Sequence, residues 1–438
     1  MASLTPPVLV ADFHLDEPLS DLNASGRFES ARLLVWLHGL PVGEVAFELR
    51  RRPLGAEEVA TTVWPLIRDT VGRHCENDGL PAPDTLNRDG LNRPSQPPCA
   101  RRLMAPEDGP YVTVAIATRN RPEGLLRCLD SVTRLAYPSF EVVIVDSAPS
   151  DDRTEAALTK SEPWPFPLRY VRVERPGLAI AHNAALENAN GDIMALTDDD
   201  VEVDRQWLSV LVRAFVDFDA ACVNGLILPA ELETAAQLLI ERSGGFARGF
   251  VPHVYELDKP ESDPLFPFTA GRFGSGANMA FRTDWLRSHR GFDAAMGTGS
   301  PARGGDDLLA YLTVITGGRT LVYEPAAVVR HWHRREYEGM RRQAFNYGVG
   351  FGAYVAAAVA AQPTLLPKMI GLTVPAVRYF MSPRSAKNQN REEGFPRELI
   401  WLERLGLFVG PAAYANSRLR LAAYRRAERS TTSARRSR

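Results

Sequence analysis

The chain has 438 residues, more than one ordinary domain contains, so we expect two or three folded units. With 45% hydrophobic and 24% charged residues it has the composition of a globular protein, which excludes a disordered chain. The formal net charge of −2 gives the whole molecule no electrostatic attraction to nucleic acid, and we expect no nucleic-acid partner.

The cysteines and the first residues of the chain indicate the cellular compartment. The four cysteines lie far apart and form no CxxC pair, so the sequence predicts neither a disulfide framework nor a zinc site. Residues 1–17 lack the basic and long apolar segments of a signal peptide. No segment offers about 20 apolar residues free of helix breakers, so we expect no membrane-spanning helix. These features predict a cytoplasmic protein.

Residues 1–100 are predicted to form a small α+β domain that ends in a linker. Residues 31–38 and 44–49 have the pattern of two strands joined by a Gly/Pro turn, and residues 57–75 have helical spacing of apolar side chains. The linker, residues 77–98, is rich in Pro, Asn, Gly and Asp. We interpret His38 and His74 as isolated surface or packing residues, because no catalytic group of residues surrounds them in the sequence.

From residue 111 onward the pattern alternates between strands and helices. Strands are predicted at residues 111–118, 140–146 and 168–173, each followed by a helical segment. This alternation indicates βαβ crossovers and a mostly parallel sheet. No GxGxxG follows the first strand and no GxxxxGK[ST] occurs, so the sheet lacks both the dinucleotide-binding fingerprint and the P-loop.

Residues 191–200 form a short apolar strand that ends in Asp198, Asp199 and Asp200. Ligands of open α/β sheets bind beyond the carboxyl ends of the strands, and carboxylates placed there can hold Mg²⁺ together with substrate phosphates. Acidic residues that cap the next helix would give the same triplet. The triplet alone does not choose between these interpretations.

Other polar residues lie where predicted strands end or helices begin. Asp146 either starts an Asx turn or binds a base or ribose. Asp306 and Asp307 either complement a helix dipole or supply a general base. His331 and His333 are either a polar exit from the sheet or candidate metal ligands.

Together, the segments between residues 111 and 335 resemble the family 2 glycosyltransferases, which have the GT-A fold. The family's motifs are matched, in order, by Thr118, Asn120 and Arg121, by residues 145–151, by residues 181–185, by Asp198 and Asp200, by residues 276–282, by Gly305, Asp306 and Asp307, and by His331. Three positions depart from the family's pattern. His182 stands where Arg is common, Asp306 replaces the common Glu, and His333 is close enough to His331 to replace it as a ligand.

The resemblance implies a Rossmann-like, mostly parallel sheet flanked by helices, over residues 105–335. It implies an inverting, metal-dependent enzyme that moves a hexosyl or deoxyhexosyl group from a nucleotide-sugar, linked to UDP, GDP or dTDP. The acceptor would be a hydroxyl of a glycan, a lipid-linked glycan or a small molecule. Mn²⁺ or Mg²⁺ would neutralise charge on the diphosphate leaving group.

The resemblance also implies roles for individual residues. The implied metal ligands are Asp198, Asp200 and His331, and the implied base is Asp307, with Asp306 as the alternative. The implied nucleotide contacts are Thr118, Asn120, Arg121, Asp146, Asn183, Asp198 and Asp199. The implied acceptor or sugar contacts are Gly276, Ala277 and Asn278. We expect the dipole of the following helix to keep Asp307 ionised at neutral pH.

Residues 336–438 are predicted to be a helical region with a basic tail, and the last predicted helix is residues 399–408. Residues 417–438 contain eight arginines and one acidic residue, Glu428. One interpretation is a solvated tail. The other is attraction to an anionic membrane leaflet, at the inner face of the membrane, where a lipid-linked acceptor would be found.

Two other functions remain open. A sugar-phosphate nucleotidyltransferase would need a Gly- and Arg-rich loop after the first strand, and residues 118–122 do not supply one. A non-catalytic protein that binds nucleotide-sugars or carbohydrates on the same fold would be expected to have lost the acids, whereas Asp198, Asp200 and Asp307 are all present.

Overall fold

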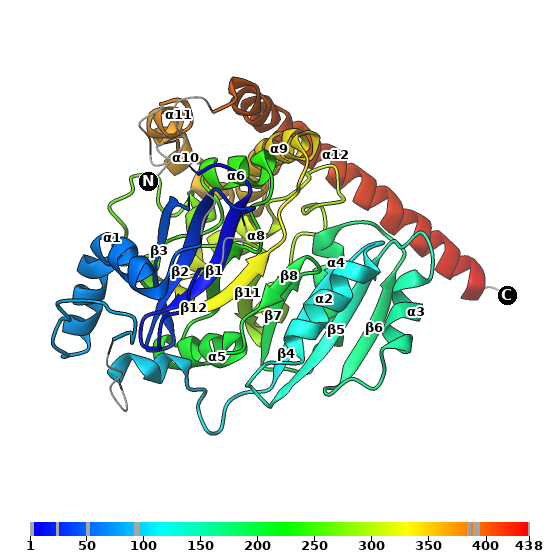
Figure 1. The fold of residues 1–438 in the computed structure, drawn as a ribbon. Coiled ribbons are helices and arrows are strands. Elements are labelled where there is room, and N and C mark those ends of the chain that lie inside the picture. The colour runs from blue at the N-terminus through cyan, green and yellow to red at the C-terminus, as the bar shows by residue number, and fades with distance from the viewer. Residues whose placement is uncertain are drawn as a thin grey trace.

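The structure is a computed structural model and describes residues 4–22, 26–49, 53–91, 97–382, 385, 387–388 and 395–436, with side chains up to residue 427. Figure 1 shows a small sheet near the N-terminus, a large central sheet flanked by helices, and a long C-terminal helix. The α/β fold with a mostly parallel sheet and a helical C-terminal region, expected from the sequence, is confirmed.

The N-terminal unit is a three-stranded sheet with one helix packed against it. Its elements are β1 (Val8–His14), β2 (Ser30–Leu37), β3 (Leu40–Glu48) and α1 (Ala56–Asn77). The hairpin and the helix agree with the sequence analysis, whereas β1, which pairs in parallel with β2, was not identified there.

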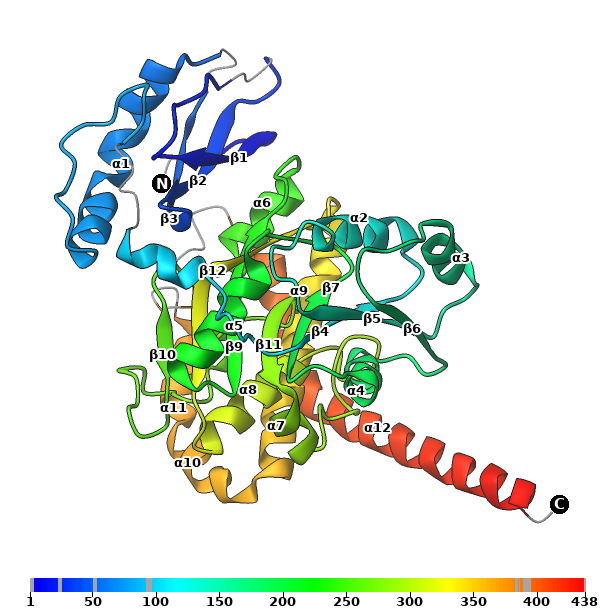
Figure 2. The same cartoon turned by 90° about the horizontal axis from the view of Figure 1, so that it is seen from below.

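Alternate residues of β2 serve two interfaces, because successive side chains of a strand point to opposite faces. Leu33 and Val35 pack with the apolar face of α1. Leu34 and Trp36 pack against residues of the central sheet. The small unit is therefore joined to the central sheet through apolar contacts. Figure 2 shows the position of this unit from below.

The central sheet has the strand order β10-β12-β9-β11-β7-β4-β5-β6, and β8 pairs with the end of β12. Its strands are β4 (Val112–Thr118), β5 (Phe140–Ser147), β6 (Leu168–Val173), β7 (Ile193–Asp198), β8 (Val201–Val203), β9 (Cys222–Pro229), β10 (His253–Tyr255), β11 (Asn278–Arg282) and β12 (Leu321–His331). Six strands share one direction, and β8, β10 and β11 run against them. The parallel strands therefore bring their carboxyl ends to one edge.

Helices cover both faces of this sheet. They are α2 (Pro122–Val132), α3 (Arg153–Lys160), α4 (Leu178–Asn188), α5 (Trp207–Phe218), α6 (Ala235–Arg242), α7 (Thr283–Ser288) and α8 (Asp306–Thr316), with the 3-10 turns η1 (Pro98–Leu103) and η2 (Ala270–Arg272). Val142 and Ile144 of β5 pack on the side of α2 and α5, and Val143 and Val145 pack on the side of α4 and α8. Each such side chain contributes about 1.5–3 kcal/mol through its burial.

The C-terminal region consists of α9 (Tyr337–Ala361), η3 (Pro363–Leu365), α10 (Leu366–Gly371), α11 (Thr373–Met381) and α12 (Arg397–Arg436). The last helix was predicted at residues 399–408, and α12 is far longer than this. By length and hydropathy α9 fits a membrane span, but 44% of its apolar window is buried inside the protein.

The glycines of α9 allow this helix to pack closely against α12. A side chain at Gly348 or Gly352 would overlap carbonyl oxygens of α12, and one at Gly406 of α12 would overlap the backbone of α9. The two helices therefore touch through their backbones. Small residues four positions apart allow this close approach, which here lies inside the protein.

Candidate active site

The first part of the site forms where β7 and β12 end. β7 stops at Asp198, the chain turns through Asp199 and Asp200, and β8 returns antiparallel to the end of β12. In this pairing Val201 lies opposite His331, and the backbone N–H of Trp332 donates to the carbonyl of Asp200 at 2.9 Å. The β8–β12 pair thus places His331 beside the aspartate triplet.

Asp198, Asp200 and His331 form a group that could hold a metal ion. Their potential ligand atoms all lie within 4.8 Å of one another, and Nε2 of His331 is 3.3 Å from Oδ1 of Asp200. Carboxylate oxygens suit Mn²⁺ and Mg²⁺, and imidazole binds transition metals. These are the three metal ligands that the resemblance implied.

Asp199 faces the other way. Its side chain is 5% exposed, Thr118 Oγ1 donates to Oδ2 at 2.7 Å, and Nη1 of Arg121 lies 3.1 Å from Oδ1. The same guanidinium nitrogen is 2.9 Å from Oδ2 of Asp200. Asp199 and Thr118, which the sequence analysis assigned to the nucleotide, therefore form a hydrogen bond with each other. Arg121 contacts both Asp199 and Asp200 and so helps to position the triplet.

The carboxyl groups of Asp198 and Asp200 differ in their pKa. Burial and the negative charge of Asp200 raise the pKa of Asp198 to about 7. Burial acts on Asp200 in the same direction, but the hydrogen bond and charge of His331 and the charge of Arg121 outweigh it and lower the pKa of Asp200 to about 2. Asp200 is therefore the anionic centre of the group, and a divalent cation would favour ionisation of Asp198 as well.

Asp146 lies on β5, which is separated from β7 by β4, and is fully buried. The hydroxyl of Tyr170 donates to its Oδ2 at 3.1 Å, while Oδ1 makes no hydrogen bond of ordinary geometry to the described residues. Burial raises the pKa of this carboxyl group. Buried acceptors are nearly always satisfied, so Oδ1 is suited to receive an N–H or O–H group of a ligand. Asn120 accepts a bond from the N–H of Ser150 at 2.9 Å and so links the loops after β4 and β5.

The two acids of residues 306 and 307 begin α8. Oδ2 of Asp307 accepts from the N–H of Gly276 at 3.0 Å, and its Oδ1 accepts from the N–H of Leu308 at 2.8 Å. Asp306 is 5% exposed, with Oδ2 at 3.5 Å from Nδ1 of His182. Of the two acids, Asp307 is the more accessible.

Burial and the charge of Asp306 raise the pKa of Asp307 to about 6, against the opposing effect of its backbone hydrogen bonds. At this pKa Asp307 is still mostly ionised at neutral pH, as expected, although its pKa is higher than the helix dipole alone would give. Burial decides its pKa.

Three further residues of the predicted site have their polar groups engaged inside the protein. The side-chain amide of Asn183 binds the backbone N–H and the carbonyl of Phe292, both at 2.8 Å. Asn278 is fully buried and binds the indole of Trp207 and the carbonyls of Leu226 and Ala327. The carbonyl of Ala277 accepts from Thr197. The side chains of Asn183 and Asn278 thus bind other parts of the protein, and their contacts with a ligand stay predictions, whereas Gly276 lies against Asp307.

Comparison with known proteins agrees with this geometry. Residues 113–290 match the family model described as glycosyl transferase family 2. This part of the chain is a family 2 glycosyltransferase domain. The family 2 match ends before α8 and β12, so Asp306, Asp307 and His331 come from the segment that follows the matched residues.

Several curated proteins resemble the family 2 domain. A pre-mycofactocin glycosyltransferase of Mycobacterium tuberculosis is 29% identical over 252 residues, which are 56% of this chain and 48% of the relative. The glycosyltransferase AglE of Haloferax volcanii is 33% identical over 101 residues, 23% of this chain and 33% of the relative. The chain thus spans about half the length, or less, of these relatives.

Among solved structures, a mannosyltransferase from Pyrobaculum calidifontis in complex with GDP-Man and Mn²⁺ matches with 22% identity and a TM-score of 0.42. The match covers 73% of this chain and 76% of that one.

A chain of hydrogen-bonded groups, which the sequence analysis missed, runs from the family 2 domain to the N-terminal unit. Nδ1 of His331 is 3.0 Å from Nδ1 of His333, Nε2 of His333 is 2.8 Å from Oε1 of Glu241, and Arg32 Nη1 is 2.7 Å from Oε2 of Glu241. These residues come from β12, the segment after it, α6 and β2, so their separation in the sequence concealed the connection.

These hydrogen bonds give His331 and His333 different orientations. The carboxylate of Glu241 can only accept, so Nε2–H of His333 donates to it, and Nδ1 of His333 can accept from Nδ1–H of His331. Nε2 of His331 faces Asp200. Burial opposes protonation, but the hydrogen bond and charge of Asp200 outweigh it and raise the pKa of His331, and a cation bound here would replace the proton on Nε2. His331, and not His333, is the histidine at the aspartates, and it has the outer hydrogen bond that metal-binding histidines usually have.

Proposed function

We propose that the chain is an inverting, metal-dependent glycosyltransferase that moves a sugar from a nucleoside-diphosphate donor to a hydroxyl acceptor. The observation that carries the proposal is the meeting of Asp198, Asp200 and His331 at the carboxyl edge of a family 2 sheet, with a second acid, Asp307, on α8. His182 acts electrostatically on both Asp198 and Asp307, which supports their belonging to one site.

Each residue of the site has a separate role in the proposed reaction. Asp146 would accept a hydrogen bond from the donor's base or ribose through Oδ1. Asp198, Asp200 and His331 would hold Mn²⁺ or Mg²⁺, which neutralises charge on the departing diphosphate. Asp307 would take the proton of the acceptor hydroxyl while the hydroxyl oxygen forms a bond to the anomeric carbon. The electron pair of the broken bond would leave with the diphosphate, and attack from the opposite side inverts the anomeric centre.

The experiment that tests this proposal is calorimetric binding of UDP-, GDP- and dTDP-sugars, with and without Mn²⁺ or Mg²⁺. We expect Asp200→Ala to remove metal-dependent binding, because it deletes the ionised carboxylate of the group. The control is Asp192→Ala, which removes an exposed carboxylate just before the other end of β7. If Asp200→Ala binds donor with unchanged affinity and unchanged metal requirement, the proposed metal site is wrong.

We also propose that the C-terminal region places the enzyme on the inner face of a membrane, near a lipid-linked acceptor. The support is a set of exposed apolar side chains at helical spacing, here called the apolar stripes. They are Ile370, Val374 and Val377 of α10 and α11, and Trp401, Leu405 and Phe408 of α12, each more than half exposed. Arg404 of α12 contacts the carbonyl of Met381 at 3.4 Å, so the two helices lie together. Exposed apolar surface beside basic residues is typical of interfacial helices.

A further inference from the structure

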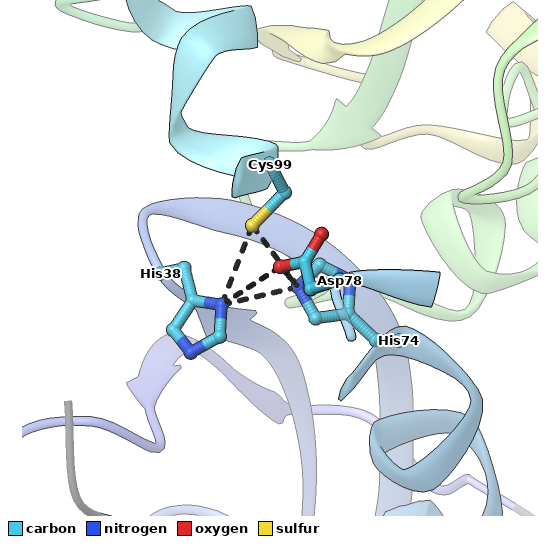
Figure 3. A group of neighbouring side chains, drawn as sticks. All are labelled: His38, His74, Asp78 and Cys99. Atoms are coloured by element: carbon cyan, nitrogen blue, oxygen red, sulfur yellow. Dashed lines mark hydrogen bonds and ion pairs between the residues drawn. The ribbon is translucent and has the colours of Figure 1, made fainter. Parts of the chain in front are cut away.

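Outside the active site, four metal-binding side chains from separate segments converge at one point in the N-terminal unit (Figure 3). His38 lies in the β2–β3 turn, His74 in the last turn of α1, Asp78 at the cap that follows, and Cys99 in η1. The sequence analysis treated the two histidines as isolated and expected no zinc site. The two histidines are not isolated, because the fold brings these residues together.

The distances within the cluster are those of a tetrahedral site. Nδ1 of His38 is 3.3 Å from Nε2 of His74 and 3.3 Å from Sγ of Cys99, and these last two atoms are 3.4 Å apart. Oδ2 of Asp78 is 3.5 Å from the His38 nitrogen and 3.6 Å from the His74 nitrogen. Zn–N, Zn–O and Zn–S bonds of about 2.0–2.3 Å at tetrahedral angles separate neighbouring ligand atoms by about 3.3–3.6 Å.

Hydrogen bonds alone do not account for this arrangement. Nδ1 of His38 faces three polar atoms at once, and a ring nitrogen carries at most one proton. Oδ2 of Asp78 is buried and makes no hydrogen bond of ordinary geometry to the described residues. Buried polar atoms without partners are rare, and a shared cation would satisfy all four groups together.

We propose that His38, His74, Asp78 and Cys99 form a structural zinc site. A thiolate and a carboxylate balance the charge of Zn²⁺, and a thiolate ligand favours zinc over Mg²⁺ or Mn²⁺. Four protein ligands leave no position for substrate, which is the property of a structural site. The site goes beyond glycosyl transfer and does not depend on it.

The position of the cluster indicates what the metal holds together. Cys99 belongs to η1, and Arg102 of the same turn pairs with Glu324 of β12, Nε to Oε2 at 3.2 Å. Arg101 pairs with Asp217 of α5 at 3.2 Å. Zinc would therefore tie α1 and the β2–β3 turn to the segment that enters the family 2 domain.

The test is the zinc content of the purified full-length chain, measured by mass spectrometry of the metal after exhaustive dialysis. We expect about one zinc per chain, the ratio of a single closed site. Cys99→Ala and His74→Ala should lose it, with a fall in affinity greater than the ~10–100-fold that loss of an outer-shell partner causes. Cys222→Ala, which removes a buried thiol of the central sheet, and Asp200→Ala, which alters the other candidate metal group, should keep it.

Cobalt substitution of the wild-type chain gives a second, independent measurement. A thiolate-to-cobalt absorption band should appear in wild type and in Asp200→Ala, because the group at Asp198, Asp200 and His331 contains no sulfur. The band should be absent from Cys99→Ala. A wild-type chain without stoichiometric zinc and without this band overturns the proposal, even if Cys99→Ala does not fold. Equal zinc in wild type and folded Cys99→Ala also overturns it.

Discussion

At the scale of single residues, Asp307 shows opposing influences on one carboxylate. Two backbone N–H groups and a helix N-terminus favour its ionised form, while burial and the adjacent Asp306 favour its protonated form. Burial prevails, and the pKa is raised to about 6. A general base works best when its pKa lies near the operating pH, so this value suits the proposed proton transfer.

We expect the single-turnover transfer rate to rise with pH through about 6 and then level off, because Asp307 must lose its proton before it can accept another. Asp307→Asn should bind donor normally and slow transfer by ~10²–10⁴-fold, the usual contribution of a general base.

Asp306→Asn is the matched control for the base. It removes the neighbouring acid of the same helical turn and should be milder. If transfer is slower in Asp306→Asn than in Asp307→Asn, Asp306 is the base. If both variants keep the full transfer rate, the two acids only cap the helix.

The sequence predicted which acids stand at strand and helix ends, because their positions follow from short local patterns. It could not predict where side chains such as Asn183 and Asn278 point. Asn278 binds the carbonyls of Leu226 and Ala327 on other strands, and Asn183 binds the backbone of Phe292. A motif gives a residue its place in the chain, whereas its partners depend on tertiary packing.

At the scale of elements, β12 and α6 together hold His331. The ring of His333 lies between His331 and Glu241 and packs beside Phe246. The strands and helices around the site were predictable from their apolar periodicity. The three-residue β8 was not, because it is too short for a pattern and its partner β12 lies far along the chain.

We expect His333→Phe to weaken metal-dependent donor binding by ~10–100-fold, because it removes the acceptor that orients His331. Titration calorimetry with Mn²⁺ and donor measures this effect, and circular dichroism checks that the fold is kept. Phe246→Leu is the control, since it changes the packing around both rings and no hydrogen bond. Equal losses in the two variants would show that packing, and not the hydrogen bond, is responsible.

At the scale of the whole molecule, the far end of α12 projects beyond the family 2 domain (Figures 1 and 2). Its apolar stripe lies in the first half and its arginines lie mostly in the second, including Arg420, Arg425 and Arg426. The basic composition was visible in the sequence. The helix that carries it was predicted too short, because the sequence analysis ended the helix before Pro411 and the second half of α12 is mostly polar.

Removal of residues 417–438 should reduce binding to phosphatidylserine vesicles at low salt, and the difference should shrink as salt rises, because screening acts over ~10 Å at 0.1 M. Phe408→Ser should reduce binding at all salt concentrations, since it removes apolar contact. Vesicle co-sedimentation measures both effects. If the truncated and intact chains bind equally at low salt, the arginines do not direct the enzyme to membranes.

The glycines of α9 have a consequence for how distant parts of the molecule communicate. On one side Gly350 lies against the backbone of Gly304 and Gly305, just before Asp306, and on the other Gly348 and Gly352 lie against α12. Contacts between backbones contain no rotamers that could absorb a small displacement, and packed interiors transmit strain. A shift of α12 on a surface would therefore pass through α9 to the start of α8. The helix that would meet a membrane is thus linked through α9 to the residues just before the acid that would accept the proton.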